Sequence, residues 1–255
     1  MRFSRYVALG DSTTEGLEDP DGRGGYRGWA DRFAEHVASV HPGLAYANLA
    51  VRGMFASEIE ATQLAPALAM TPDLATVVAG MNDLLRRDFD PLRVAGHVGT
   101  MVRELVAIGA TTITFTIPDV SRRMRLGRRL SERTLAMNAE IRRLAALHGA
   151  IVLDLASYEL SSDPRMWAVD RLHGNPAGHA QIAGELAHLL ALPGAPPTAR
   201  GVSLPPSPPP PLHEVIARDA SWIVRFVVPW AWRRVRGQRP TALPKRPTLT
   251  PVRPL

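Results

Sequence analysis

The 255-residue chain contains no cysteine. Disulfide bonds, thiolate metal sites and a cysteine nucleophile are therefore excluded, while the redox compartment stays open. The chain also lacks an apolar run of about 20 residues, the length that a membrane-spanning helix needs; the nearest candidate, 222–232, is broken by Arg225 and Pro229. The first residues do not show the charged, apolar and small-residue pattern of a secretory signal, so we expect a cytoplasmic protein.

Acidic residues are scarce in the C-terminal quarter of the chain. Residues 193–255 hold ten basic and two acidic residues, a net charge of +8, whereas the whole chain carries +6. The rest of the chain is therefore slightly acidic, at −2. Because the positive charge belongs to the tail alone, the body does not have the charge of a duplex-binding enzyme, and we predict no nucleic-acid partner.

Composition and proline content divide the chain into four parts. The length and the 45% hydrophobic content fit one α/β domain over 1–192. Residues 193–211 are proline-rich and predict an extended linker. An amphipathic segment rich in Trp and Arg follows at 212–236, and the proline- and arginine-rich 237–255 is expected to be disordered. The amphipathic segment is typical of a helix that lies on an anionic lipid surface, packs back on the body or self-associates.

Short apolar runs alternate with helical patterns along the body. Strands are predicted at 6–9, 44–49, 74–79, 111–117 and 151–155, and helices at 28–40, 91–108, 131–147 and 176–190. Strands separated by helices predict an α/β fold with a five-stranded parallel sheet and helices on both faces. Ligands of such sheets bind at the carboxyl ends of the strands.

The first strand runs directly into Gly10, Asp11 and Ser12. A serine on a tight strand-to-helix turn can act as a nucleophile, and its own N–H can donate to an oxyanion. The same residues also suit a helix N-cap, with Glu15 three residues after Ser12 as in a capping box.

A second candidate pair, Asp170 and His173, precedes the last predicted helix. Three residues of separation within a turn let the carboxylate accept a hydrogen bond from His173 Nδ1, which leaves Nε2 free to take a proton from a hydroxyl. A metal site is the competing interpretation, with His179 as a further ligand, although no third and fourth ligands cluster nearby.

Two further residues could donate to an oxyanion. Asn82 follows the third predicted strand and carries a side-chain amide, and Gly53 could offer its backbone N–H because no Cβ obstructs the approach. Each residue also fits an ordinary turn.

Taken in order along the chain, these motifs resemble the SGNH hydrolase family, also called GDSL-type esterases and lipases. The resemblance covers about residues 3–190. Its four blocks are matched by Gly10-Asp11-Ser12, by residues 48–53, by residues 80–83 and by residues 170–173. The sequence departs from the family pattern at Thr13, where leucine is usual, and at Gly174, where proline often stands.

The resemblance implies a three-layer α/β/α flavodoxin-like SGNH hydrolase fold that cleaves a small-molecule acyl ester. It implies Ser12 as nucleophile, His173 as base and Asp170 as the residue that orients the base. It also implies an oxyanion hole made by Ser12, Gly53 and Asn82, and no metal or cofactor. No Gly-Xaa-Ser-Xaa-Gly motif occurs, which disfavours the other large α/β esterase fold.

Two alternatives to an ester hydrolase stay open. An acyltransferase would use the same residues and pass the acyl group to an alcohol in place of water. A non-catalytic lipid- or carbohydrate-binding module could keep the scaffold, although the complete set of candidate residues argues against it. Arginines within 121–129 could recognise an anionic group on the substrate, and the same residues also suit a solvated basic loop.

Overall fold

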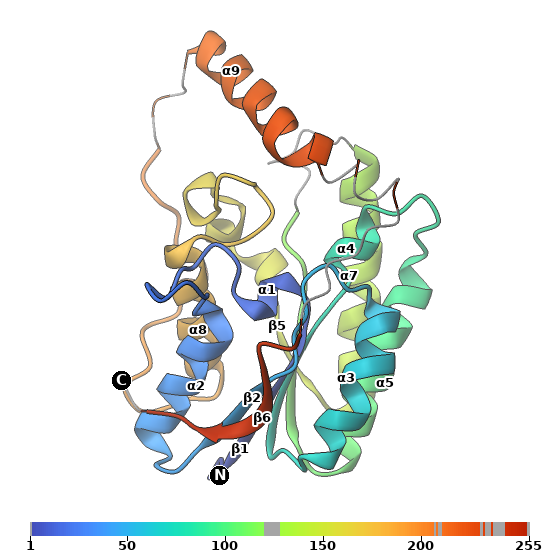
Figure 1. The fold of residues 1–255 in the computed structure, drawn as a ribbon, viewed down its shortest axis with the longest axis vertical. Coiled ribbons are helices and arrows are strands. Elements are labelled where there is room, and N and C mark those ends of the chain that lie inside the picture. The colour runs from blue at the N-terminus through green and yellow to red at the C-terminus, as the bar shows by residue number, and fades with distance from the viewer. Residues whose placement is uncertain are drawn as a thin grey trace.

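The computed structural model describes residues 2–119, 128–206, 208, 211–229, 232, 236 and 243–253 (Figure 1). The strands are β1 (Arg5–Gly10), β2 (Ala45–Asn48), β3 (Leu74–Val78), β4 (Thr111–Phe115), β5 (Ile151–Leu153) and β6 (Arg246–Pro251). The helices are α1 (Ser12–Glu15), α2 (Gly28–Val40), α3 (Ala56–Ala69), α4 (Met81–Leu84), α5 (Pro91–Ala107), α7 (Arg128–His148), α8 (Pro176–Leu189) and α9 (Leu212–Trp222). Short 3₁₀ turns lie at Leu155–Ser157, Glu159–Ser162 and Pro164–Met166, and a π-helical turn at Ile223–Val227 continues α9.

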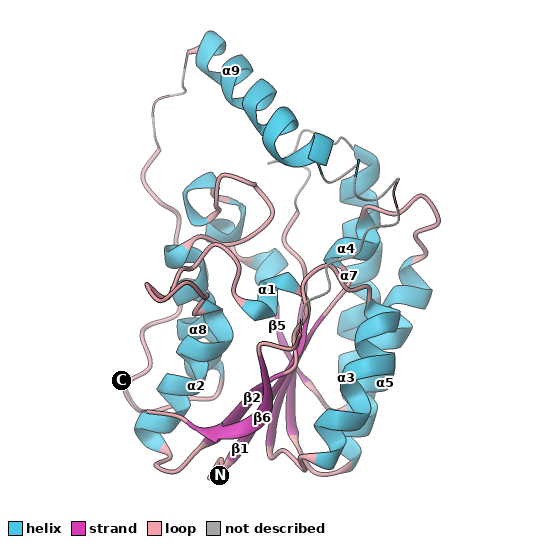
Figure 2. Cartoon of the chain, viewed as in Figure 1, coloured by secondary structure: helices cyan, strands magenta, loops and turns pink. Residues whose placement is uncertain are grey.

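The sheet has the strand order β5-β4-β3-β1-β2-β6, and its first five strands are parallel. Helices cover both faces, with α2 and α8 on one and α3, α5 and α7 on the other (Figure 2). Each face of the sheet packs against its helices in a separate hydrophobic core. Along β1, Tyr6 and Ala8 lie in the core under α2 and α8, and Val7 and Leu9 lie in the core under α3, α5 and α7, because side chains alternate along a buried strand. The predicted three-layer α/β/α fold of flavodoxin-like order is confirmed.

The prediction of a five-stranded sheet was wrong, because β6 adds a sixth strand antiparallel to β2. This strand lies within 237–255, where we expected disorder. Its prolines are tolerated because an edge strand needs hydrogen bonds on one side only. The single lysine of the chain anchors it: Lys245 Nζ donates to the Arg27 carbonyl (2.7 Å) and lies 3.0 Å from Asp31 Oδ2.

Helix α3 had no counterpart in the sequence prediction. Its buried side contains Ile59, Gln63 and Ala67, spaced four residues apart, and Pro66 lies inside the helix. A glutamine in the buried stripe and an internal proline both weaken the helical pattern, since neither residue is expected there.

The carboxyl ends of the parallel strands lie at the upper end of the molecule in Figure 1, and α9 crosses above that same end. None of the helices in the described part of the chain is long and apolar enough to span a membrane.

Candidate active site

The turn after β1 lies at the topological switch point of the sheet, between β1 and β3. On one side of this point the chain forms β2, and on the other side it forms β3, β4 and β5. A side chain at Gly10 would have its Cβ only 2.2 Å from Thr14 Oγ1 and 2.9 Å from the Val78 carbonyl, so the position requires glycine. The side chain of Gln63 holds the backbone of Gly10 from α3: Gly10 N–H donates to Oε1 (2.8 Å), and Nε2 donates to the Gly10 carbonyl (2.9 Å).

Asp11, and not Ser12, caps the short helix α1. Asp11 Oδ1 accepts hydrogen bonds from the N–H (3.0 Å) and the hydroxyl (2.9 Å) of Thr13. Glu15 does not close a capping box, because its carboxylate forms an ion pair with Arg52. The side chain of Ser12 is therefore not needed for capping and stays available for other contacts.

Ser12, His173 and Asp170 form a continuous hydrogen-bonded line. His173 Nδ1 lies 2.6 Å from Asp170 Oδ2, and His173 Nε2 lies 2.7 Å from Ser12 Oγ. The carboxylate favours the tautomer with the proton on Nδ1, so Nε2 accepts the hydrogen bond of the Ser12 hydroxyl. Ser12 and His173 are each only 7% exposed, which keeps this line largely out of water.

Local hydrogen bonds build the turn that carries the pair. Asp170 Oδ1 accepts from the N–H groups of Leu172 (2.9 Å) and His173 (3.0 Å), and Arg171 takes a left-handed φ of 63°. Burial raises the pKa of Asp170, but the hydrogen bonds from His173 and the backbone outweigh it and leave the pKa below its ordinary value. Asp170 is thus ionised at neutral pH.

The C-terminal helix contacts this turn directly. The indole N–H of Trp222 on α9 donates to the Asp170 carbonyl (2.8 Å). Arg171 forms an ion pair with Asp219 (2.7 Å), and its guanidinium lies 4.9 Å from the centre of the Trp222 ring. The tail is therefore attached to the loop that holds the histidine.

Asn82 follows β3 and reaches the turn that contains Ser12. Its Nδ2 donates to Asp11 Oδ2 and to the Met54 carbonyl, both at 3.0 Å. An oxyanion would be a third acceptor for this amide. The backbone N–H groups of Ser12 and Gly53 have no acceptor within hydrogen-bond distance in the described part of the chain, and Gly53 adopts a φ of 79°.

Two buried carboxyl groups hold the turn after β3, one to the turn after β1 and one to the start of α3. Asp11 binds Asn82, and Asp83 Oδ2 accepts the N–H of Ala56 at the start of α3 (3.0 Å). Burial raises the pKa of both carboxyl groups, and the charge of Asp11 raises that of Asp83 further. These contacts and the bond from Asn82 to the Met54 carbonyl join the turn after β3 to the Ser12 turn and to the 54–56 backbone.

His179 does not serve as a metal ligand. Its Nδ1 accepts from the Trp29 N–H (3.1 Å), and its Nε2 donates to the Leu17 carbonyl (2.9 Å), so both ring nitrogens are used. Burial lowers the pKa of His179 to about 4, which keeps the ring neutral. No group of three or more His, Asp or Glu side chains suited to a metal occurs among the residues that the structure describes.

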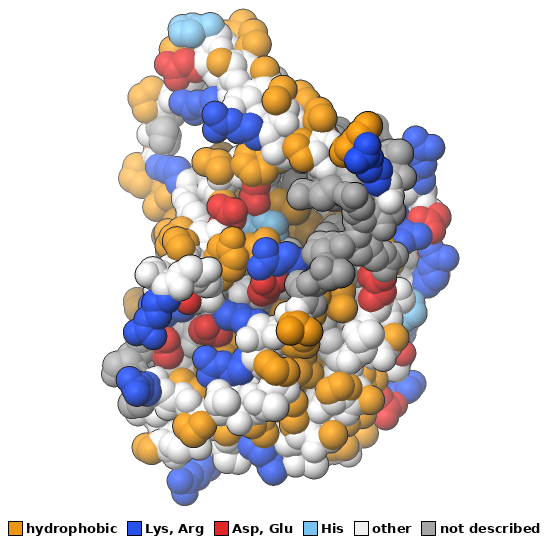
Figure 3. Space-filling model, in the orientation of Figure 1, with side chains coloured by type: hydrophobic (Ala, Val, Ile, Leu, Met, Phe, Trp, Pro, Cys, Tyr) orange, Lys and Arg blue, Asp and Glu red, His pale blue; other side chains and the backbone are white. Residues whose placement is uncertain are grey.

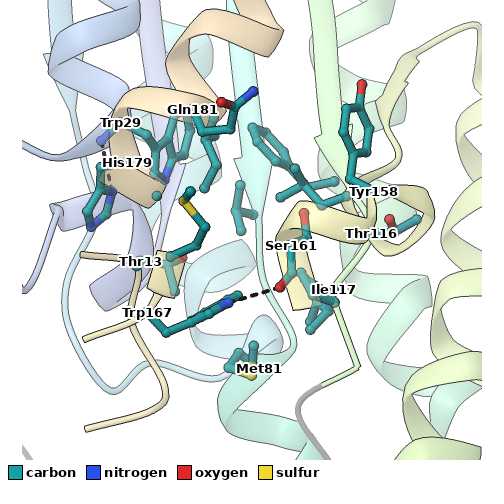
Figure 4. Close-up of a pocket in the computed structure, with 18 of the residues that line it drawn as sticks. Thr13, Trp29, Met81, Thr116, Ile117, Tyr158, Ser161, Trp167, His179 and Gln181 are labelled. Carbon is teal, nitrogen blue, oxygen red and sulfur yellow. Dashed lines mark hydrogen bonds between the residues drawn. The ribbon is translucent and has the colours of Figure 1, made fainter. Parts of the chain in front are cut away.

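An apolar cavity of about 90 Å³ adjoins the turns of Ser12 and His173 (Figure 4). Thr13 and Trp167 point into it, and the Trp167 indole N–H donates to the Ser161 carbonyl (2.9 Å). Its other lining residues include Trp29, Met81, Phe115, Ile117, Leu160, Met166, Leu172 and Ile182. The cavity is suited to an apolar group attached to a carbonyl at Ser12.

The profile of the GDSL-like Lipase/Acylhydrolase family matches residues 8–181. The chain belongs to this family. The matched region begins in β1 and includes all the candidate site residues named above from Asp11 to His179. Among proteins with curated descriptions, none matches the sequence.

Solved structures of GDSL-like esterases and lipases share the fold. A catalytic mutant of Axe2, an acetylxylan esterase from Geobacillus stearothermophilus, is 16% identical, with a TM-score of 0.60 and coverage of 73% of this chain and 94% of that one. A lipase/acylhydrolase from Enterococcus faecalis is 21% identical, with a TM-score of 0.60 and coverage of 74% and 94%. The family and the fold support an ester hydrolase at the family level.

Several residues that hold this GDSL-like site together were not predicted from the sequence. Gln63 was detectable as a polar residue among apolar ones spaced by four, once α3 is recognised. Trp222 and Asp219 had no local signal, because their contacts with the 170–171 turn join segments about 50 residues apart. Residues 120–127, which include most of the proposed arginine loop, lie outside the described residues.

Proposed function

We propose that this GDSL-like protein is a serine hydrolase that cleaves carboxylic esters through an acyl-enzyme on Ser12. The observation that carries the proposal is the hydrogen-bonded line from Asp170 Oδ2 through His173 to Ser12 Oγ, with distances of 2.6 and 2.7 Å. A serine that donates to a histidine, which in turn donates to a buried carboxylate, is the arrangement that activates a hydroxyl as a nucleophile.

In the first half of the reaction, Ser12 Oγ attacks the ester carbonyl while His173 Nε2 accepts the hydroxyl proton. The imidazolium that forms is stabilised by the Asp170 carboxylate. His173 then gives the proton to the departing alcohol as the bond between the acyl carbon and the alcohol oxygen breaks. The acyl group stays on Ser12 as an ester.

In the second half, water attacks the acyl-enzyme and His173 again accepts and returns the proton, which releases the acid and free Ser12. The negative oxygen of each tetrahedral intermediate would lie against the N–H groups of Ser12 and Gly53 and the Asn82 amide. The N–H groups of Ser12 and Gly53 have no other acceptor among the described residues, whereas the Asn82 amide already donates to Asp11 and Met54. The two backbone N–H groups are therefore free to donate to the oxyanion.

The cavity beside the Ser12 turn supports an apolar acyl group. Most of the side chains that line it are apolar, among them Phe115, Ile117 and Leu160.

The test is hydrolysis of p-nitrophenyl acetate, butyrate, octanoate and palmitate by the wild type and by Ser12→Ala. We expect turnover by the wild type and loss of turnover in Ser12→Ala, and the preferred ester shows which acyl chain length the site accepts. Ser39→Ala on α2 is the matched control, since it removes an exposed serine that bonds only to the His36 carbonyl. Mass spectrometry of the protein with substrate should show one acyl group on the peptide that contains Ser12.

Turnover that survives in Ser12→Ala would contradict the proposed nucleophile. A Ser12 acyl-enzyme that releases product only when an alcohol is added would identify an acyltransferase instead. No acylation and no turnover with any chain length would favour a non-catalytic binding module.

A further inference from the structure

Helix α9 leaves a band of apolar side chains exposed. Leu212, Ile216, Ile223, Val224 and Val228 are between 46% and 72% exposed, and Trp232 beyond the helix is 57% exposed. The other large exposed apolar residues of the described chain come from several elements, such as Leu92 on α5 and Leu135 on α7. Figure 3 shows hydrophobic side chains gathered along α9 at the end of the molecule, with basic side chains between them.

The opposite side of α9 faces the body. Asp219, Trp222 and Phe226 line a groove against the 164–171 loop. Asp219 and Trp222 also bind Arg171 and Asp170, in the turn that carries His173. The helix thus already has its own attachment to the protein. The exposed band is a second apolar surface, one that the fold does not use.

The charge around the band is positive. Both acidic residues of the segment are paired with arginine: Glu214 with Arg218 (3.1 Å) and Asp219 with Arg171 (2.7 Å). Arg225, which also lines the groove, and Arg236 are exposed, and residues 193–255 carry a net charge of +8. Two copies that met through this face would bring these charges together and repel, whereas an anionic surface would attract them.

We propose that the exposed band of α9, Leu212 to Val228, binds a membrane surface that contains anionic lipid. The apolar side chains would enter the boundary between headgroups and acyl chains, and the arginines would lie among the headgroups. Because α9 crosses the end of the molecule at which the strands deliver Ser12, this contact faces the active site toward the lipid (Figure 1). The contact does not depend on the proposed esterase chemistry.

Vesicle flotation of the full chain tests the proposal, with phosphatidylcholine vesicles that do or do not contain about 30 mol% phosphatidylglycerol. We expect the protein to float with the anionic vesicles, and to float less as salt is raised because salt screens the attraction. The double variant Ile216→Gln/Ile223→Gln should bind at least about tenfold more weakly, since it removes exposed apolar area. Arg225→Gln should weaken binding about fivefold.

The matched control is Leu92→Gln/Leu135→Gln, which removes two leucines that are 66% and 62% exposed on the body. This variant should float like the wild type.

Absence of binding to anionic vesicles, or equal binding by both double variants, would overturn the proposal. Sedimentation provides the other decisive outcome: a dimer that Ile216→Gln/Ile223→Gln converts to monomer, without vesicle binding, would identify the band as an interface between copies. Flotation needs no turnover, so an inactive protein still gives an answer.

Discussion

The proposed nucleophile and the proposed base of this site come from two regions that are built differently. Ser12 follows the central strand of the sheet, and buried contacts from Gln63 and Asn82 hold its turn. His173 lies in a long loop of 3₁₀ turns after β5, held by local hydrogen bonds and by α9. The sheet therefore determines the place of Ser12, whereas local turns and the tail determine the place of His173.

Among substitutions that affect the His173 region and leave the Ser12 turn unchanged, Asp170→Asn is expected to lower activity most. The amide keeps the size of the side chain and can still accept the two backbone N–H groups, but it loses the charge and the preferred His173 tautomer. We expect kcat on p-nitrophenyl acetate to fall about 10⁴-fold. The thermal midpoint of unfolding serves as the control for folding. Activity within tenfold of wild type would show that the Asp170 charge is not used.

On the nucleophile side, Asn82→Ala removes one candidate oxyanion donor. We expect a fall in kcat of about 10²–10³-fold with little change in KM, because an oxyanion exists only during the reaction. The variant also loses the contacts with Asp11 and Met54. Circular dichroism should show that it remains folded. Full activity would mean that the Ser12 and Gly53 N–H groups suffice.

His179 joins the two regions. It lies on α8 just after the turn of residues 170–173, here called the base turn, and it binds the backbone of Trp29 and Leu17. Burial lowers its pKa to about 4 from 6.5, with Asp19, His173 and Arg32 as charged or titratable neighbours. The unfolded chain therefore binds more protons between these values, and the free energy of unfolding falls as pH falls through this window.

Because of His179, the free energy of unfolding should fall by about 3 kcal/mol between pH 6.5 and pH 4. Urea unfolding at a series of pH values measures it. His179→Gln should be less stable at pH 7 and should lose less stability in this window. An equal pH dependence in both proteins would contradict the assignment to His179.

The smallest effect is expected for Trp222→Phe, which removes the hydrogen bond to the Asp170 carbonyl and keeps an aromatic ring. We expect kcat to fall about two- to tenfold, the value of one hydrogen bond. The acidic limb of the pH–rate profile should shift as well, because the base turn is less firmly held. Trp232→Phe, on the same segment but 57% exposed, is the control. A change in stability with no change in the profile would assign Trp222 a purely structural role.

Most of the fold was predictable because it depends on local patterns. The helix at 28–40 was predicted with its observed bounds, and all five parallel strands were found to within a few residues. The strand β6 was not, since its sequence is proline-rich and the strand that it pairs with, β2, lies about 200 residues earlier.

The sequence by itself determined the residue types of the site and their order, because a serine, an asparagine and an aspartate–histidine pair each follow a recognisable element. Only the tertiary structure decided that His173 reaches Ser12, that Asn82 is shared with Asp11 and Met54, and that α9 is attached to the base turn. These contacts join segments between 28 and 161 residues apart, so their geometry depends on the packing of the whole sheet and not on any local pattern.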